Sequence, residues 1–394
     1  MFSFKSKSRA ADKSDKIGRI LVFVYLAMFF CFLVLPLFAL MSKSMQNAEG
    51  VFVGLENFAL YLKEPTLFKS FFHSLFVAFV STIIVVCLGF LYAFALQCTC
   101  IPFKGLFRVV SLIPLLSPSI LAAIALVYWF GNQGVFKEML LGHSIYGPIG
   151  IIMASVYWTF PHALMILSTS LSLSDARLYE ASDALKASKL RTFFTVTIPG
   201  AKYGIISTTF VVFILVFTDF GVPKVIGGNY NVLATDIYRE VVGMQNFQMG
   251  AVISIVLLIP ALLAFALDQF SRKRQASQLT SRAVVYVPKP HRLRDNLLLC
   301  YCLLITALVF LMLGMAQFGA LVKFWPYNLS LTLKHYNFEV AGLGWDSFFN
   351  SVRMSLYAAF FGTIIIFIGS YLICLLYTSP SPRDYAASRM PSSA

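Results

Sequence analysis

Charge is the scarcest property of this 394-residue sequence. Asp, Glu, Lys and Arg make up 12% of the residues, whereas 59% are hydrophobic; soluble domains average roughly 25% charged residues. This composition excludes an ordinary soluble domain. A transmembrane β-barrel is excluded as well, because its strands would alternate apolar and polar residues over about ten positions, and the apolar runs here are continuous.

Cysteine and catalytic signatures are also sparse. The seven cysteines include two C-x-C pairs, Cys98/Cys100 and Cys300/Cys302, which lack a further Cys or His at zinc-site spacing. We interpret them as small apolar filler and expect neither a metal nor a cofactor. The sequence contains no Walker A loop (G-x-x-x-x-G-K-[ST]), no H-E-x-x-H and no G-x-S-x-G. These absences argue against an ATP site of that kind and against an intramembrane enzyme.

Long apolar runs, by contrast, are abundant. A helix needs about 20 apolar residues to cross a bilayer, and eight runs reach roughly that length. They lie near 20–41, 72–97, 106–130, 148–172, 203–226, 248–270, 296–318 and 347–373. The first follows a basic N-terminus without an A-x-A-like cleavage site, so we interpret it as an uncleaved span rather than a signal peptide. The sequence therefore predicts an all-α, polytopic helical membrane protein.

Lys and Arg are unevenly divided between the segments that connect these runs. If the N-terminus is cytoplasmic, the cytoplasmic segments carry twenty Lys and Arg residues and the opposite segments carry nine. Because loops rich in Lys and Arg tend to remain in the cytoplasm, this bias predicts a cytoplasmic N-terminus. It also accounts for the net charge of +14 without a nucleic-acid partner.

The chain repeats itself at a fixed offset of 277 residues (297 minus 20). The span 20–41 falls on 297–318, and "SFFHS" (70–74) falls on "SFFNS" (347–351). Such self-similarity indicates a duplicated unit, with chance similarity between apolar helices as the alternative. The predicted domains are a tail (1–19), a first six-span unit (20–270), a basic linker (271–294) and the start of a second unit (295–373).

The last 21 residues depart from the apolar pattern. "CLLYTSPSPRD" (374–384) resembles one reading frame of a common transposase-type sequencing adapter, and "SRMPSSA" (388–394) resembles the primer that follows it. We interpret 374–394 as a sequencing artefact rather than a Ser/Pro-rich tail. We expect the natural protein to continue beyond Ile373, and the second unit to be truncated here.

One polar segment, residues 174–199, separates two apolar runs. Ser174 is a good N-cap, and Asp175 suits the first turn of a helix. An apolar face recurs with helical spacing at Leu178, Ala181, Ala184 and Leu185. The other faces carry Glu180, Asp183, Lys186 and Lys189, and Pro199 is expected to stop the helix before the next span. The pattern predicts an amphipathic helix, a turn and a second helical stretch, which either lie at the membrane interface or dock into a partner.

The same segment resembles the coupling loop of ABC-importer permeases, whose pattern is E-A-A, three residues, G, nine residues, then I-x-L-P. Glu180, Ala181 and Ser182 fill the first three positions, and Lys186 stands where the family prefers Gly. Val196, Ile198 and Pro199 fill the end of the pattern. The resemblance implies that a separate cytosolic ATPase holds this loop, with Asp183 and Leu185 inside the contacting stretch.

Four further stretches resemble the fused, two-half permeases of 2-aminoethylphosphonate importers. They are "FGNQG" (130–134), "HSIYGPIGI" (143–151), "TDFGVPKVIGGNYNVLATDIY" (218–238) and "VKFWPYNLSLTLKHY" (322–336). Ferric-iron and polyamine permeases are looser relatives. The resemblance implies a type I importer fold in a bacterial inner membrane, cytosolic ATPase subunits and an extracytoplasmic binding protein as partners, and no enzyme active site.

Ionisable residues within apolar runs are costly and are therefore candidates for the transport path. Asp219 lies near the end of the fifth run, where Gly221 and Pro223 interrupt the helix and Lys224 follows. An aminophosphonate zwitterion would place its ammonium on Asp219 and its phosphonate on Lys224; alternatively, Asp219 caps the broken helix or pairs with Lys224. His162 is a weaker candidate. An ion-coupled secondary transporter is the competing function, but the runs offer few buried relay groups besides Asp219.

Overall fold

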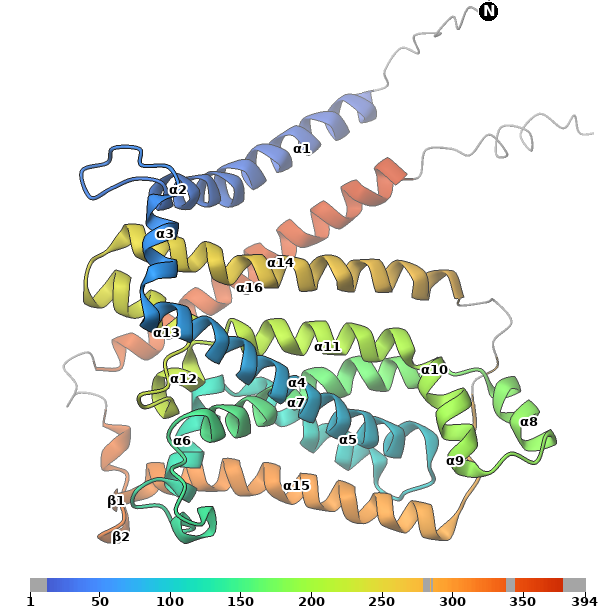
Figure 1. Cartoon of the computed structure of the whole chain (residues 1–394). Coiled ribbons are helices and arrows are strands. Elements are labelled where there is room, and N and C mark those ends of the chain that lie inside the picture. The colour runs from blue at the N-terminus through green and yellow to red at the C-terminus, as the bar shows by residue number, and fades with distance from the viewer. Residues whose placement is uncertain (1–12, 279–283, 285, 338–343, 378–394) are drawn as a thin grey trace, which may run out of the picture. The chain divides into compact units, whose positions relative to one another are not determined.

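The computed structural model describes residues 13–278, 284, 286–337 and 344–377 (Figure 1). The described chain is almost entirely helical, with one two-stranded antiparallel hairpin of β1 (Val322–Phe324) and β2 (Asn328–Leu331). The long helices are α1 (Lys13–Phe29), α4 (Pro65–Cys98), α7 (Pro148–Ser172), α11 (Lys202–Phe217), α14 (Phe247–Gln278), α15 (Arg292–Leu321) and α16 (Asp346–Tyr377). The shorter ones are α2 (Leu35–Ser44), α3 (Glu56–Lys63), α5 (Lys104–Leu112), α6 (Ser119–Phe130), α8 (Ala176–Ala184), α9 (Lys189–Thr192), α10 (Ile198–Gly200), α12 (Gly221–Ile226) and α13 (Leu233–Tyr238).

Several of these helices suit a membrane. Among the described residues, six helices are long and apolar enough to span a bilayer, or eight if each of two bent helix pairs counts as one span. The prediction of an all-α, polytopic helical protein is confirmed. Residues 378–394, most of the stretch interpreted as adapter sequence, lie outside the described residues.

Two of the expected spans are not single straight helices. The run 106–130 is bent by 99° between Lys104–Leu116 and Ser119–Phe130, because Pro118 has no backbone N–H and holds Ser117 in an extended conformation. The run 203–226 is interrupted after Phe217, and α12 begins separately at Gly221. The first interruption lies at Pro118, and the second ends at Gly221, where the sequence predicted a break.

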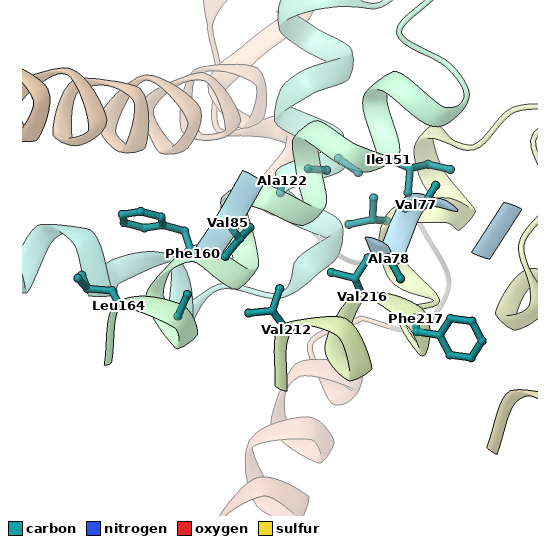
Figure 2. Close-up of a cluster of buried hydrophobic side chains, with 14 of the residues drawn as sticks. Val77, Ala78, Val85, Ala122, Ile151, Phe160, Leu164, Val212, Val216 and Phe217 are labelled. Atoms are coloured by element: carbon teal, nitrogen blue, oxygen red, sulfur yellow. The ribbon is translucent and has the colours of Figure 1, made fainter. Parts of the chain in front are cut away.

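The chain divides into two compact units, Met1–Leu40 with Leu333–Ala394, and Met41–Thr332. In the first unit α1 meets α16, where the ring of Tyr25 lies against Gly369. In the second unit α4, α7 and α11 form the centre of the core. Figure 2 shows the cluster they share, including Val85 of α4, Leu164 of α7 and Val212 of α11.

The outward side of α4 is as apolar as its buried side. Phe72, Phe76, Phe79 and Ile83 recur at helical spacing and are about half exposed or more, with exposed fractions of 49–63%. On the buried side of the same helix, Val77 and Val85 alternate with small polar residues. An apolar stripe of this size on the outside is expected of a helix that faces lipid.

Candidate functional site

The polar segment 174–199 connects α7 to α11, two helices of the central core, and forms a helical hairpin. Its first arm, α8, does not begin as the sequence predicts. Asp175 rather than Ser174 is the N-cap, and its carboxylate accepts a hydrogen bond from the Arg177 N–H at 3.1 Å. The prediction was therefore wrong by one residue, because Asp175 takes the extended conformation that an N-cap requires.

The apolar face of α8 points outward. Leu178 is 54% exposed and Leu185 is 83% exposed, and Ala181 and Ala184 are exposed as well. The buried face consists instead of Ala176, Tyr179 and Ser182. Leu190 and Phe194 on the second arm are also mostly exposed, at 73% and 64%. The hairpin thus presents an apolar surface that nothing in the described chain covers.

Hydroxyl groups connect the two arms of the hairpin. The Ser182 and Thr192 hydroxyls lie 2.7 Å apart, and the Tyr179 hydroxyl donates to Thr197 Oγ1 at 3.2 Å. Asp183 accepts a hydrogen bond from the Lys189 ammonium at 2.9 Å. Ser182, the residue that stands in place of the second Ala of the family pattern, is therefore a cross-link within the hairpin.

A sharp turn at Lys186 reverses the chain between the arms. Lys186 has a left-handed backbone with φ +52°, and the Ala187 N–H donates to the Ser182 carbonyl at 3.1 Å. This is the Schellman pattern that usually carries Gly. The bend associated with the family's Gly is thus present although the residue is Lys.

A Lys186→Gly variant is expected to stabilise the hairpin by about 0.5–1 kcal/mol, because an L-residue in the left-handed region is strained by roughly 1–2 kcal/mol and the extra freedom of unfolded Gly offsets part of the gain. Amide exchange at Ala187 measures the change. Lys186→Ala removes the charge but keeps the strained backbone, and should exchange like wild type. Slower exchange in the Ala variant than in the Gly variant would contradict the strain argument.

The second arm passes through Pro199 before it bends. The helix continues from Lys189 to Gly200 and meets α11 at an angle of 64°, so the break follows Pro199 by two residues, at Ala201. A π-helical turn over Phe193–Thr197 precedes the proline. Such a turn changes the hydrogen-bond pattern just where Pro199 lacks an N–H, which is why the helix stops later than expected.

Asp219 and Lys224 make separate contacts. The Ser119 hydroxyl donates to Asp219 Oδ1 at 2.9 Å, and the Val222 N–H donates to Asp219 Oδ2 at 3.0 Å, so Asp219 caps the first turn of α12. The Lys224 ammonium lies 4.3 Å from the centre of the Tyr238 ring. Within the described structure, these two side chains do not pair with each other.

His162 lies on α7 next to Pro161. Its ring meets Trp158 edge-on at 5.8 Å, and its Nδ1 atom is buried without a hydrogen-bond partner in the described structure. In the described part of the chain, His162 contacts Trp158 and neither Asp219 nor Lys224. The structure therefore does not assemble the three candidates into one cluster.

Sequence reasoning did not single out a second group of buried charges. Asp236 is 1% exposed and Glu240 is 6% exposed, and Arg239 approaches both, at 3.4 Å and 3.3 Å. The Asp-x-x-Arg-Glu spacing on a helical segment was the available signal. Among the residues that the structure describes, no three His, Cys, Asp or Glu side chains are arranged to hold a metal ion.

Comparisons with known proteins show similarity to the membrane permeases of transport systems. Residues 102–276 match the family described as "Binding-protein-dependent transport system inner membrane component". The chain is 28% identical to a ferric transport system permease protein of Actinobacillus pleuropneumoniae, over 76% of this chain and 46% of that protein. It is also 28% identical to the spermidine/putrescine transport system permease protein PotB of Escherichia coli, over 52% of this chain and 78% of that protein.

The fold has a solved counterpart. A chain from the crystal structure of a bacterial alginate ABC transporter, in complex with an alginate pentasaccharide-bound periplasmic protein, aligns with a TM-score of 0.52 at 14% identity. The alignment covers 69% of this chain and 98% of that one. The fold is thus that of type I ABC-importer permeases. The chain spans about half the length of the ferric permeases that it matches, 50% of one and 46% of another.

Proposed function

We propose that this chain is the membrane-spanning subunit of an ABC importer, and that the hairpin 174–199 is the loop through which a separate cytosolic ATPase drives it. The observation that carries the proposal is the uncovered apolar face of α8 and the second arm, with Leu178, Leu185 and Leu190 exposed. Exposed apolar side chains on a polar, charged hairpin are typical of a surface that docks into a partner's groove. The family match over 102–276, which includes the hairpin, supports the same assignment.

In this proposal each feature of the hairpin has a mechanical task. The outward face, with Ala181 and Leu185, contacts the ATPase and Glu180 supplies charge at its side, whereas Asp183 ties α8 to the second arm through Lys189. Because α7 and α11 belong to the central core, a displacement of the hairpin reaches the membrane helices directly. The chain then needs no nucleotide site of its own. An extracytoplasmic binding protein delivers the substrate. The chain lies in a bacterial inner membrane, with its N-terminus in the cytoplasm.

The decisive experiment is uptake by proteoliposomes that hold the full-length permease, with and without its ATPase and binding protein. ATP-dependent uptake that requires all three supports the proposal. Uptake driven by a proton or sodium gradient alone, without the ATPase, would instead identify an ion-coupled secondary transporter.

The substrate we propose is 2-aminoethylphosphonate, on the basis of the resemblance of residues 130–134, 143–151, 218–238 and 322–336 to permeases of that class. The alternative is ferric iron or a polyamine, because relatives of the chain carry those names. Uptake of each of these three compounds in labelled form is measured in competition with unlabelled 2-aminoethylphosphonate, ferric iron and spermidine. The compound that competes best identifies the substrate.

An Asp219→Asn variant tests the zwitterion hypothesis. The amide oxygen of Asn still accepts from the Val222 N–H, so the cap of α12 is retained, whereas the negative charge is lost. If Asp219 meets the ammonium of the substrate, uptake is expected to fall about tenfold or more, with an unchanged melting temperature. Asp219→Ala, which also removes the cap, is the matched variant and should lose about 1 kcal/mol of stability. Wild-type uptake by the Asn variant would assign Asp219 to capping alone.

A further inference from the structure

The hairpin 174–199 is not held by its own arms alone. Residues 286–291, which precede α15 and belong to no helix or strand, run beside it, and Figure 1 shows this segment passing α9 toward the start of α15. Pro288 and Pro290 flank Lys289, and prolines favour an extended backbone for the residues before them. We call residues 286–291 the strap.

The strap and Val284, two residues before it, contact α8 at three levels. The Ala176 N–H donates to the Val284 carbonyl at 2.8 Å. The rings of Tyr179 and Tyr286 stack with their centres 4.0 Å apart. The Lys289 ammonium pairs with Asp183 Oδ2 at 3.2 Å. These contacts follow the buried side of α8 from its first turn to its last, opposite the exposed Leu face.

Asp183 is the centre of this arrangement. Its two carboxylate oxygens accept from Lys189 of the second arm and from Lys289 of the strap. These hydrogen bonds hold the pKa of Asp183 below its ordinary value, so the carboxylate stays charged at neutral pH. One side chain thus joins both arms of the hairpin to the strap.

The other end of the strap is fixed to the membrane helices. The Arg294 guanidinium donates to the Lys289 carbonyl at 2.8 Å and pairs with Asp295 at 2.8 Å. Both residues lie in the first turn of α15, which packs on α4, α5 and α6. The Cys100 thiol, just after α4, donates to the Pro288 carbonyl at 3.3 Å. The strap therefore links α8 to the helices that surround the core.

The strap does not close tightly over the hairpin. A cavity of about 870 Å³ remains between them, lined by Tyr179, Glu180, Phe193, Tyr286 and Lys289 among others. Contact is thus concentrated at the stacked rings and at the ion pair. Among the described residues, removing those two contacts leaves the hydrogen bonds of Val284 with Ala176 and Asp175 on the strap side of α8, beside the hydroxyl bonds within the hairpin.

We propose that the strap positions the coupling helix α8, with Tyr286 and Lys289 as the positioning residues. This inference rests on the proposed function. Because the strap holds the buried side of α8, the Leu face stays oriented outward for the ATPase. Because the strap continues into α15, a movement of α8 is transmitted to α15 as well as to α7 and α11.

The test compares the variant Tyr286→Ala/Lys289→Met with the conservative variant Tyr286→Phe/Lys289→Arg, which keeps the ring and the charge. Amide exchange at Ala176 and along α8 is measured in the purified chain. The first variant is expected to exchange about tenfold faster than wild type, and the conservative one like wild type. If the first variant exchanges at the wild-type rate, the strap does not hold α8.

The second measurement is uptake per ATP hydrolysed by the full complex. The Ala/Met variant is expected to lose at least half of its uptake per ATP, and the Phe/Arg variant to retain it. Faster exchange with unchanged uptake would show that the strap exists but does not position α8 for coupling. A wild-type full-length permease without ATP-driven uptake would overturn the proposed function and with it the positioning role, whereas amide exchange would still decide whether the strap holds α8.

Discussion

A Leu185→Asp variant is expected to abolish most of the ATP-driven uptake while the protein remains folded. Leu185 is 83% exposed at the end of α8, so an aspartate there disturbs no packing inside the chain. If an ATPase groove covers this side chain, replacing leucine removes about 2 kcal/mol of apolar burial. The affinity of the permease for the ATPase then falls roughly 30-fold. Burial of an unpaired carboxylate weakens the complex further.

Pull-down of the ATPase by the permease measures the affinity, and uptake by proteoliposomes measures the consequence. Leu185→Met is the matched control, because methionine keeps the apolar volume and should retain both. The melting temperature of the isolated permease should not change in either variant. Wild-type ATPase binding by the Asp variant would remove α8 from the interface.

The membrane spans were the most predictable part of this structure. Continuous apolar runs of about 20 residues leave few alternatives to helices, and the expected runs near 72–97, 148–172 and 248–270 lie within α4, α7 and α14. The bend within the run 106–130 was not predicted, although its cause is visible in the sequence. Pro118 stands inside a run that was read as one helix, and hydrophobicity alone does not distinguish a straight span from a bent one.

The buried side of α8 could not be predicted from its apolar period. The period assigned Leu178 and Leu185 to a face for the membrane interface or a partner, and both are exposed. The buried side uses hydrogen bonds instead, from the Tyr179 hydroxyl to Thr197 and between Ser182 and Thr192. Contacts between side chains so far apart in sequence leave no periodic signal.

The linker illustrates a second limit. The sequence marked residues 271–294 as basic and polar, which is typical of a solvated connection. The contacts of Tyr286 with Tyr179 and of Lys289 with Asp183 join residues that are 107 (286 minus 179) and 106 positions apart. The alternation of Val, Tyr and Pro before α15 is typical of an extended segment, but it does not indicate that this segment contacts α8.

A Gly204→Leu variant is expected to disrupt the base of the hairpin. Gly204 lies near the start of α11, and a Cβ atom built on it would overlap Cβ and Oγ of Ser170 near the end of α7. Small residues allow membrane helices to approach this closely. A leucine must push α11 away from α7, and overpacking of this kind costs typically about 1–3 kcal/mol.

Thermal unfolding in detergent measures this destabilisation, and the matched control is Gly314→Leu on α15, where an added Cβ has no neighbour within 4 Å. A compensating pair makes the argument specific. Gly204→Ala alone should destabilise the protein, whereas Ser170→Gly with Gly204→Ala should recover stability, because the second substitution removes the atoms that clash. Since α7 and α11 carry the two ends of the hairpin, the Leu variant should also lose ATP-driven uptake. Equal melting temperatures for Gly204→Leu and Gly314→Leu would show that α7 and α11 do not need this close contact.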